Sequence, residues 1–232
     1  MSHLFGMNLD WLVYIFKDVL IFFNNYFNNW GLSIIVLTLI LKFILFPTTL
    51  KQFRSMDKMK RVQPKLKEIQ DKYKDNPEEM QRRTMELYKK ENVNPFGSCL
   101  PTLLQIPILI GFYYLLSDPK YLGDLMKNSH FLGIDLMAKN NIILAVLSGI
   151  STFYQQKLTT VTAPADPNQK MLMYFMPAFL GFITYTVSAG VGLYWFTSNL
   201  IGIGQQYLIN EYFIVKEHLQ EKKDKEEPTE KK

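Results

Sequence analysis

Lys42 has the least ordinary setting of any residue in this sequence that could do chemistry. It lies inside the stretch 32–50, which is otherwise apolar apart from one serine and three threonines. Such a stretch can cross a bilayer as a helix, and Lys42, nine residues before Lys51, would then lie roughly 13 Å below the membrane surface. A lysine at that depth costs about 2.5–3.5 kcal/mol to insert. We therefore expect a partner or water to meet its ammonium group.

Uncharged polar residues in this and other apolar stretches could provide that environment. Thr38 lies one helical turn before Lys42 and shares its face; the others are Gln105, Gln155, Gln156, Ser198, Asn199, Gln205 and Gln206. Singly, each has a simpler role as a hydrogen bond between helices, worth about 0.6 kcal/mol. Because the apolar stretches contain no Asp, Glu or His, no salt bridge is available to Lys42 there. The pattern favours a water-filled groove open to the cytoplasm over a side chain that snorkels to the headgroups.

Five stretches have the length and composition of membrane-spanning helices. They are residues 31–50, 96–117, 141–158, 171–188 and 191–210. They predict an all-α polytopic membrane protein whose spans enclose the groove. The segment 51–95 holds 13 Lys and Arg, whereas residues 1–30 hold only one. Because cytoplasmic loops carry the excess of Lys and Arg, we expect the N-terminus outside and the C-terminus in the cytoplasm.

The segments between the spans are also predicted from their composition. Residues 51–95 indicate a cytoplasmic helical hairpin, with apolar residues at spacings of three and four and a turn at Asp75-Asn76-Pro77. Pro64 is expected to kink the first helix or to begin a new one. The connections 118–140 and 159–170 are expected outside and in the cytoplasm, and the charged tail 211–232 is expected to be disordered.

The first 30 residues favour an amphipathic helix over residues 8–27 that lies in the outer membrane interface. Lys17 and Asp18 interrupt its apolar residues, and several asparagines follow them. A sixth span is the alternative, and it would place the N-terminus inside. No basic segment or cleavage site typical of a secretory signal peptide is evident.

The same sequence argues against an enzyme. His3, His130 and His218 all lie outside the expected spans, and Cys99 is the only cysteine. No motif for a catalytic triad, a metal site or a phosphate-binding loop is present. We expect no cofactor and no metal. The net charge of +5 is explained by the cytoplasmic hairpin, so DNA is not an expected partner. The chemistry favours a binding surface.

Several motifs resemble the YidC/Oxa/Alb family of membrane insertases. The most distinctive is Asn94-Pro95-Phe96-Gly97-Ser98-Cys99-Leu100-Pro101, followed by Gln105 and Pro107. Trp30-Gly31-Leu32 before Lys42, Gln63-Pro64-Lys65-Leu66, Met176-Pro177, Gly192-Leu193-Tyr194-Trp195, Ser198-Asn199 and Gln205-Gln206 follow the family pattern as well. The resemblance covers roughly residues 30–212.

The resemblance implies a five-span bacterial form without the large periplasmic domain of some relatives, located in the plasma membrane. It implies a groove with a positive residue, here Lys42 where the family usually has arginine. Lysine keeps the charge but lacks arginine's planar fork. The family's substrate contacts correspond to Thr38 and Trp195, and the groove residues expected here are Lys42, Thr38, Gln105, Gln155, Trp195, Ser198, Asn199 and Gln205.

These expectations lead to one main functional hypothesis and two alternatives. The main one is an insertase and chaperone for small membrane proteins, acting alone or with the Sec translocon. Its partners would be nascent membrane proteins and membrane lipid, with the ribosome and the signal recognition particle or its receptor as further candidates. The alternatives are a small anion transporter or channel that binds its solute at Lys42, and a membrane chaperone that assists a translocon without inserting anything itself.

Overall fold

The computed structural model describes residues 3–4, 7–94, 100–118, 120–126, 129–159 and 167–211. In chain order the elements are β1 (His3–Leu4), β2 (Met7–Asn8), α1 (Asp10–Phe27), α2 (Trp30–Ile44), α3 (Phe46–Lys72), α4 (Pro77–Lys90), α5 (Leu100–Ser117), η2 (Gly123–Met126), β3 (His130–Phe131), β4 (Ile134–Asp135), α6 (Ile142–Thr159), α7 (Pro167–Thr186) and α8 (Ala189–Ile209). The expected all-α class is confirmed. The strands described form two short antiparallel ribbons, β1–β2 and β3–β4.

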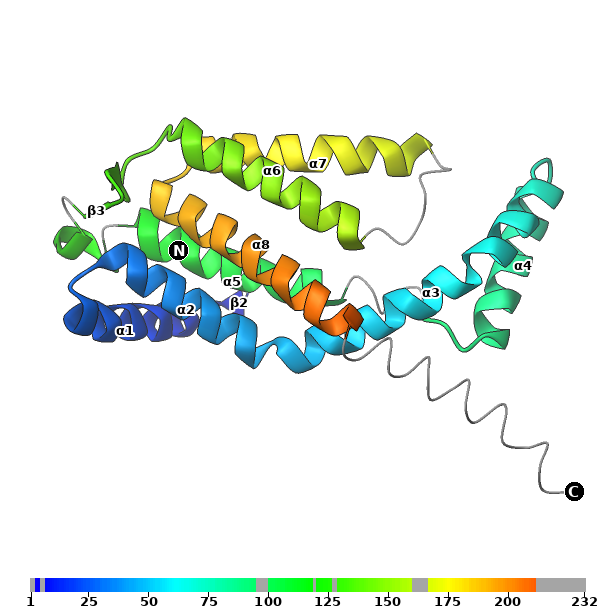
Figure 1. Ribbon diagram of the computed structural model, residues 1–232, viewed down its shortest axis with the longest axis horizontal. Helices are drawn as coiled ribbons and strands as arrows, with labels where there is room; N and C mark the ends of the chain where they lie inside the picture. Colours follow the sequence, from blue (N-terminus) through cyan, green and yellow to red (C-terminus); the bar gives the residue numbers. More distant parts are fainter. Residues whose placement is uncertain are drawn as a thin grey trace, which may run out of the picture. The chain divides into compact units, whose positions relative to one another are not determined.

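Three expected features fall wholly or partly outside the described residues. They are the central residues 95–99 of the distinctive motif, residues 160–166 of the connection before α7, and residues 212–232 of the tail. The chain forms two compact units. The first comprises Met1–Phe46, Thr102–Leu158 and Pro164–Ile203; the second comprises Pro47–Pro101, Thr159–Ala163 and Gly204–Lys232. Figure 1 shows the helices of both units.

Asparagine side chains begin three of the helices. The Oδ1 atoms of Asn29, Asn76 and Asn141 accept hydrogen bonds from backbone N–H groups three residues on, at 3.0, 3.1 and 2.9 Å. These bonds satisfy donors that a helix leaves unpaired at its start. Asn28 ends α1 in the left-handed conformation, which asparagine tolerates better than most residues. The asparagines that interrupt the apolar N-terminal segment therefore separate α1 from α2.

The core of the first unit joins helices from both ends of the sequence. Phe16 of α1 packs against Phe112 of α5, with 5.2 Å between ring centroids, and Phe112 stacks on Tyr194 of α8 at 4.1 Å. All three side chains are buried. Figure 1 shows α6 and α7 side by side, and Gly149 and Gly181 meet at that contact. Small residues permit such close approach between helices in membranes.

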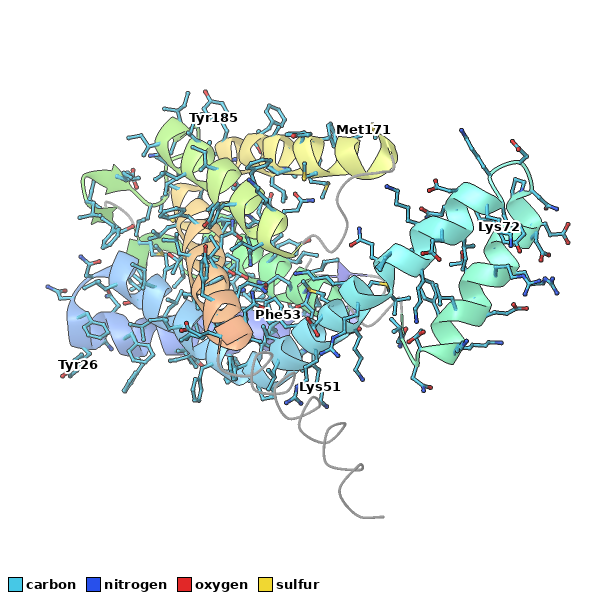
Figure 2. All side chains as sticks on the ribbon, turned by 45° about the vertical axis from the view of Figure 1, so that its right-hand side comes forward. Tyr26, Lys51, Phe53, Lys72, Met171 and Tyr185 are labelled. Atoms are coloured by element: carbon cyan, nitrogen blue, oxygen red, sulfur yellow. The ribbon has the colours of Figure 1, made fainter. Side chains whose placement is uncertain are left out.

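The second unit contains a helical hairpin of α3 and α4. Phe53, Met56 and Val62 of α3 are buried, while Lys51 and Lys72 project from its surface (Figure 2). The ammonium group of Lys65 donates to Glu91 Oε1 at 2.6 Å, which links α3 to the end of α4. Pro64 lies inside α3 without ending it, so the expected alternative of a new helix at that proline is wrong.

The first expected span is divided in the structure. α2 ends at Ile44, and α3 starts at Phe46 and continues beyond residue 50 into the hairpin. Pro47 lies in the first turn of α3, where its missing N–H group is not needed. Among the described residues, no single helix meets the length and hydropathy required of a membrane span; α2 and α3 meet them only together, as a bent pair.

Candidate functional site

Four of the predicted site residues line one recess in the first unit. Thr38 and Lys42 come from α2, Gln105 from α5 and Ser198 from α8. The recess, together with the open space at its mouth, has a volume of about 180 Å³, and Leu41, Leu45, Ile108 and Tyr194 complete its lining. Three helices that are far apart in the sequence thus bring their polar residues to one place.

Helical spacing explains the pairs that each helix contributes. Thr38 and Lys42 lie four residues apart on α2, as do Tyr194 and Ser198 on α8. Residues at this spacing project from the same face of a helix, one turn apart. The sequence pattern alone identified the first pair as a shared face.

Tyr194 is the polar residue of the lining that was not predicted from the sequence. Its side chain is buried, its hydroxyl accepts a hydrogen bond from Gln105 Nε2, and its ring stacks on Phe112. A tyrosine in an apolar span is usually read as a residue that packs in the core. Its position four residues before Ser198 was the signal that could have identified it.

Thr38 lies in the wall of the recess without offering a free donor. Its side chain is buried, and Oγ1 donates to the carbonyl oxygen of Ile34 at 2.7 Å. Threonines in helices commonly form this bond to their own backbone. Thr38 therefore contributes a compact side chain whose hydroxyl proton is already engaged.

Lys42 is half-buried and shares the recess with hydroxyl and amide side chains. The enclosed part of the recess has room for about one water molecule. It is far too small for a transmembrane helix. The geometry therefore supports a site that holds water or a short polar group beside a cation, with any longer apolar segment outside it.

A second polar cluster joins α6 to α8. Trp195 Nε1 donates to Thr152 Oγ1 at 3.0 Å, and Asn199 Nδ2 lies 2.8 Å from the same oxygen. Asn199 Nδ2 also lies 3.0 Å from Ser151 Oγ. Two predicted site residues, Trp195 and Asn199, thus take part in this helix contact and not in the lining of the recess. Ser151 and Thr152 were missed, although two adjacent hydroxyl residues in an apolar span are a visible signal.

The remaining predicted residues are the two glutamines. Gln155 lies against Gly202 of α8, so it too belongs to the contact between α6 and α8. Gln205 is half-buried near the end of α8 and belongs to the second unit. The structure therefore does not place Gln205 in the recess. Among the side chains that the structure describes, no three His, Cys, Asp or Glu residues gather as metal ligands would.

Comparison with known proteins gives consistent results. The family model described as 60Kd inner membrane protein matches residues 22–217. The chain is 41% identical over 187 residues to the protein named membrane protein insertase YidC of Francisella tularensis subsp. novicida (strain U112), a match that covers 80% of this chain and 33% of that protein. The YidC of subsp. mediasiatica (strain FSC147) gives the same values.

A solved structure resembles this one closely. It is described as an active YidC insertase crystal structure with the first transmembrane domain resolved, and it matches with a TM-score of 0.69 and 28% sequence identity. The match covers 89% of this chain and 48% of that one. The chain thus spans about a third of the length of the curated relatives and about half of the solved chain.

Proposed function

The chain belongs to the 60Kd inner membrane protein family, and on that premise we propose that it inserts small membrane proteins into the bacterial inner membrane. The observation that carries the proposal is the recess, in which Lys42 lies with Gln105 and Ser198. Relatives that are 41% identical are named insertases, which favours this function over anion transport. The name of these relatives describes the insertion of proteins into membranes. The function that we propose requires no covalent chemistry.

We propose that the recess receives the short polar terminus of the substrate. Lys42 attracts negative charge on that terminus, and water in the recess lowers the cost of removing it from bulk solvent. Because the recess is too small for a helix, the apolar segment of the substrate moves along the surfaces of α2 and α8 into lipid. Burial of apolar area, at about 25 cal/mol per Å², drives this step. Neither nucleotide nor cofactor takes part.

The proposed topology has five spans, with the N-terminus outside and the hairpin in the cytoplasm. The bias of Lys and Arg toward residues 51–95 supports this orientation. The hairpin of α3 and α4 would first receive the hydrophobic segment of a nascent membrane protein. The ribosome, the signal recognition particle or its receptor, and the Sec translocon are candidate partners for that step.

Substitution of Lys42 tests the charge attraction. Lys42→Ala should lower insertion of a single-span substrate with an acidic translocated tail by about 10- to 150-fold, because a hydrogen bond to a charged group is worth about 1.5–3 kcal/mol. Lys42→Glu should lower it further, and Lys42→Arg should retain it. The matched substrate with a neutral tail should respond much less. Wild-type insertion by both Lys42→Ala and Lys42→Glu would rule out this step.

Photocrosslinking tests the path of the substrate. A crosslinker at Thr38 or at Trp195 should capture stalled nascent chains of a membrane protein. One on Lys72, an exposed residue of the hairpin, should capture them only at earlier, shorter chain lengths. Capture at Lys72 throughout, with none at Thr38 and Trp195, would contradict the proposed path.

A further inference from the structure

The helix α8 carries two polar faces with different surroundings. Tyr194 and Ser198 line the recess, whereas Trp195 and Asn199 bond to α6. Each pair has the spacing of one helical turn, and the two pairs are offset by one residue. The proposed substrate contact Trp195 is therefore held by α6 and not by the helices of the recess.

One oxygen atom accepts hydrogen bonds from both residues of this second face. Thr152 Oγ1 lies 3.0 Å from Trp195 Nε1 and 2.8 Å from Asn199 Nδ2. Asn199 is further fixed by Ser151 Oγ at 3.0 Å, and both of these residues are buried. An indole has a single hydrogen-bond donor and no acceptor. Its only polar group is therefore fully engaged by Thr152.

We propose that Thr152 is a positioning residue that fixes the indole of Trp195 and hides its N–H group from the substrate. This inference rests on the proposed insertase function. The ring of Trp195 is only partly buried and packs beside the main core. With its donor engaged, the ring offers a passing helix an apolar surface without a hydrogen-bonding group.

The chemical consequence concerns release of the substrate. In an apolar environment a free N–H group binds any available hydroxyl or carbonyl oxygen, because an unsatisfied donor is costly there. A substrate helix that contains serine or asparagine would be retained by an exposed indole N–H group. Hiding the donor lets α8 release apolar and partly polar helices alike, which a general insertion surface requires.

Two variants and a control test the role of Thr152. Thr152→Val keeps the shape but removes the acceptor, and Thr152→Ser restores the hydroxyl. Thr184→Val is the control, since Thr184 is also buried and its hydroxyl donates to Leu180 O within its own helix at 2.9 Å. Replacing Trp11 and Trp30 by Phe leaves Trp195 as the only tryptophan, so ultraviolet resonance Raman spectroscopy can report on its N–H bond.

The first measurement is the Raman band that is sensitive to indole hydrogen bonding. It should shift in Thr152→Val and stay in place in Thr152→Ser and Thr184→Val. The second is the time for which a substrate remains close enough to α8 to be crosslinked to it. Two substrates are compared, one with an all-leucine helix and one with a central serine. Thr152→Val should retain the serine substrate about threefold longer, as expected for one interhelical hydrogen bond. The all-leucine substrate should be unaffected.

The outcomes separate this inference from the proposed function. An unshifted Raman band in Thr152→Val, or equal retention of both substrates, overturns the role of Thr152 even if the wild-type chain inserts both. General destabilisation would slow both substrates alike and so counts against the inference. If the wild-type chain inserts neither substrate, the proposed function is wrong, and Thr152 then has no role in substrate release.

Discussion

At the scale of single residues, Tyr194 has two separate tasks. Its ring stacks on Phe112 at 4.1 Å between centroids in the core, and its hydroxyl accepts the hydrogen bond of Gln105 in the recess. One side chain therefore connects the packing of the core to the polar lining of the site. The two tasks can be separated by substitution.

Tyr194→Phe keeps the ring and removes the hydroxyl. We expect a loss of about 0.6–1.7 kcal/mol in the free energy of unfolding, the range for an interhelical hydrogen bond in a membrane protein. Tyr194→Ala also removes the stacked ring and should lose about 3–5 kcal/mol. Unfolding in mixed micelles measures both values. Equal losses for the two variants would show that the hydroxyl, and not the ring, dominates.

The site residues differ in how visible they are from the sequence. Lys42 stands out because a cation in an apolar stretch has few physical explanations. Tyr194 and Thr152 give weaker signals, in the spacing of Tyr194 from Ser198 and in the adjacent hydroxyl residues Ser151 and Thr152, and the sequence does not show which helices their partners lie on. The sequence also grouped Trp195 and Asn199 with Ser198, because periodicity along α8 cannot tell which neighbouring helix each face contacts.

At the scale of elements, the contact between α6 and α7 depends on two glycines. A Cβ atom on Gly181 would lie 3.1 Å from the carbonyl oxygen of Ala145 and 3.6 Å from Gly149 Cα. Backbone atoms on the neighbouring helix cannot turn aside as a flexible side chain can. The close approach therefore requires the absence of a side chain at this position.

Gly181→Leu should separate the two helices. We expect a loss of about 1–3 kcal/mol in the free energy of unfolding, the usual cost of inserting atoms into a packed contact. Gly204→Leu on α8 is a matched control, because nothing lies within 4 Å of its added Cβ atom. Chemical unfolding of both variants measures the difference. If Gly204→Leu were destabilised as much as Gly181→Leu, the loss would come from leucine itself and not from the contact between the helices.

The hairpin offers a prediction on pH. The hydrogen bond and charge of Lys65 lower the pKa of Glu91 below its ordinary value of 4.5. A carboxylate with a lowered pKa stabilises the folded state above its unfolded pKa, and that contribution disappears as the pH falls through its folded value. We therefore expect α3 and α4 to separate more readily as the pH falls below the ordinary carboxylate pKa and Glu91 takes up a proton.

Spin labels on exposed positions of α3 and α4 measure that separation. The distribution of distances between the labels should broaden as the pH falls from 6 to 3.5. In Glu91→Gln this distribution should already be broad at pH 6. Glu86→Gln is the control, because Glu86 bonds to Arg83 within α4. High salt should weaken the effect, since both side chains of the pair are partly exposed. A Glu91→Gln variant that matches wild type at every pH would contradict the role of the ion pair.

The elements show which parts of a fold follow from local pattern. The turn at Asp75-Asn76-Pro77 and the asparagine before α2 correspond to helix ends in the structure, because capping and proline chemistry act over a few residues. The break after Ile44 was not predicted, although Pro47 lies just beyond it. The stretch without charges continues through that break to Leu50, so an assignment based on apolar length merges the two helices.

At the scale of the whole molecule, the predicted topology depends on where α1 lies. Its first residue, Asp10, accepts a hydrogen bond from Tyr121 at 2.6 Å, and Tyr121 follows the end of α5. Its last turn leads directly into α2, whose Gly31 packs against Phe131 in the same connection between α5 and α6. Both ends of α1 therefore lie near residues of one connection. Whether α1 is an interfacial helix, as we predict, or a sixth span can be tested directly.

The two faces of α1 are consistent with that placement. Val13, Phe16 and Leu20 are buried against the unit, while Trp11 and Tyr26 are 61% and 79% exposed. Figure 2 shows Tyr26 projecting from the surface. Aromatic residues of this kind favour the boundary between lipid and water. A helix that lies there needs one apolar face for the protein and one for the membrane surface.

Cysteine labelling in spheroplasts distinguishes the two topologies. In a Cys99→Ser background, Trp11→Cys and Tyr26→Cys should both react with a membrane-impermeant thiol reagent added outside. Lys72→Cys in the hairpin should react only after the membrane is permeabilised. A sixth span would carry Trp11 to the cytoplasmic side while Tyr26 stays outside, so that Trp11→Cys would behave like Lys72→Cys. Because the two ends of α1 are compared within one helix, a difference between them reports on its orientation and not on the accessibility of the protein as a whole.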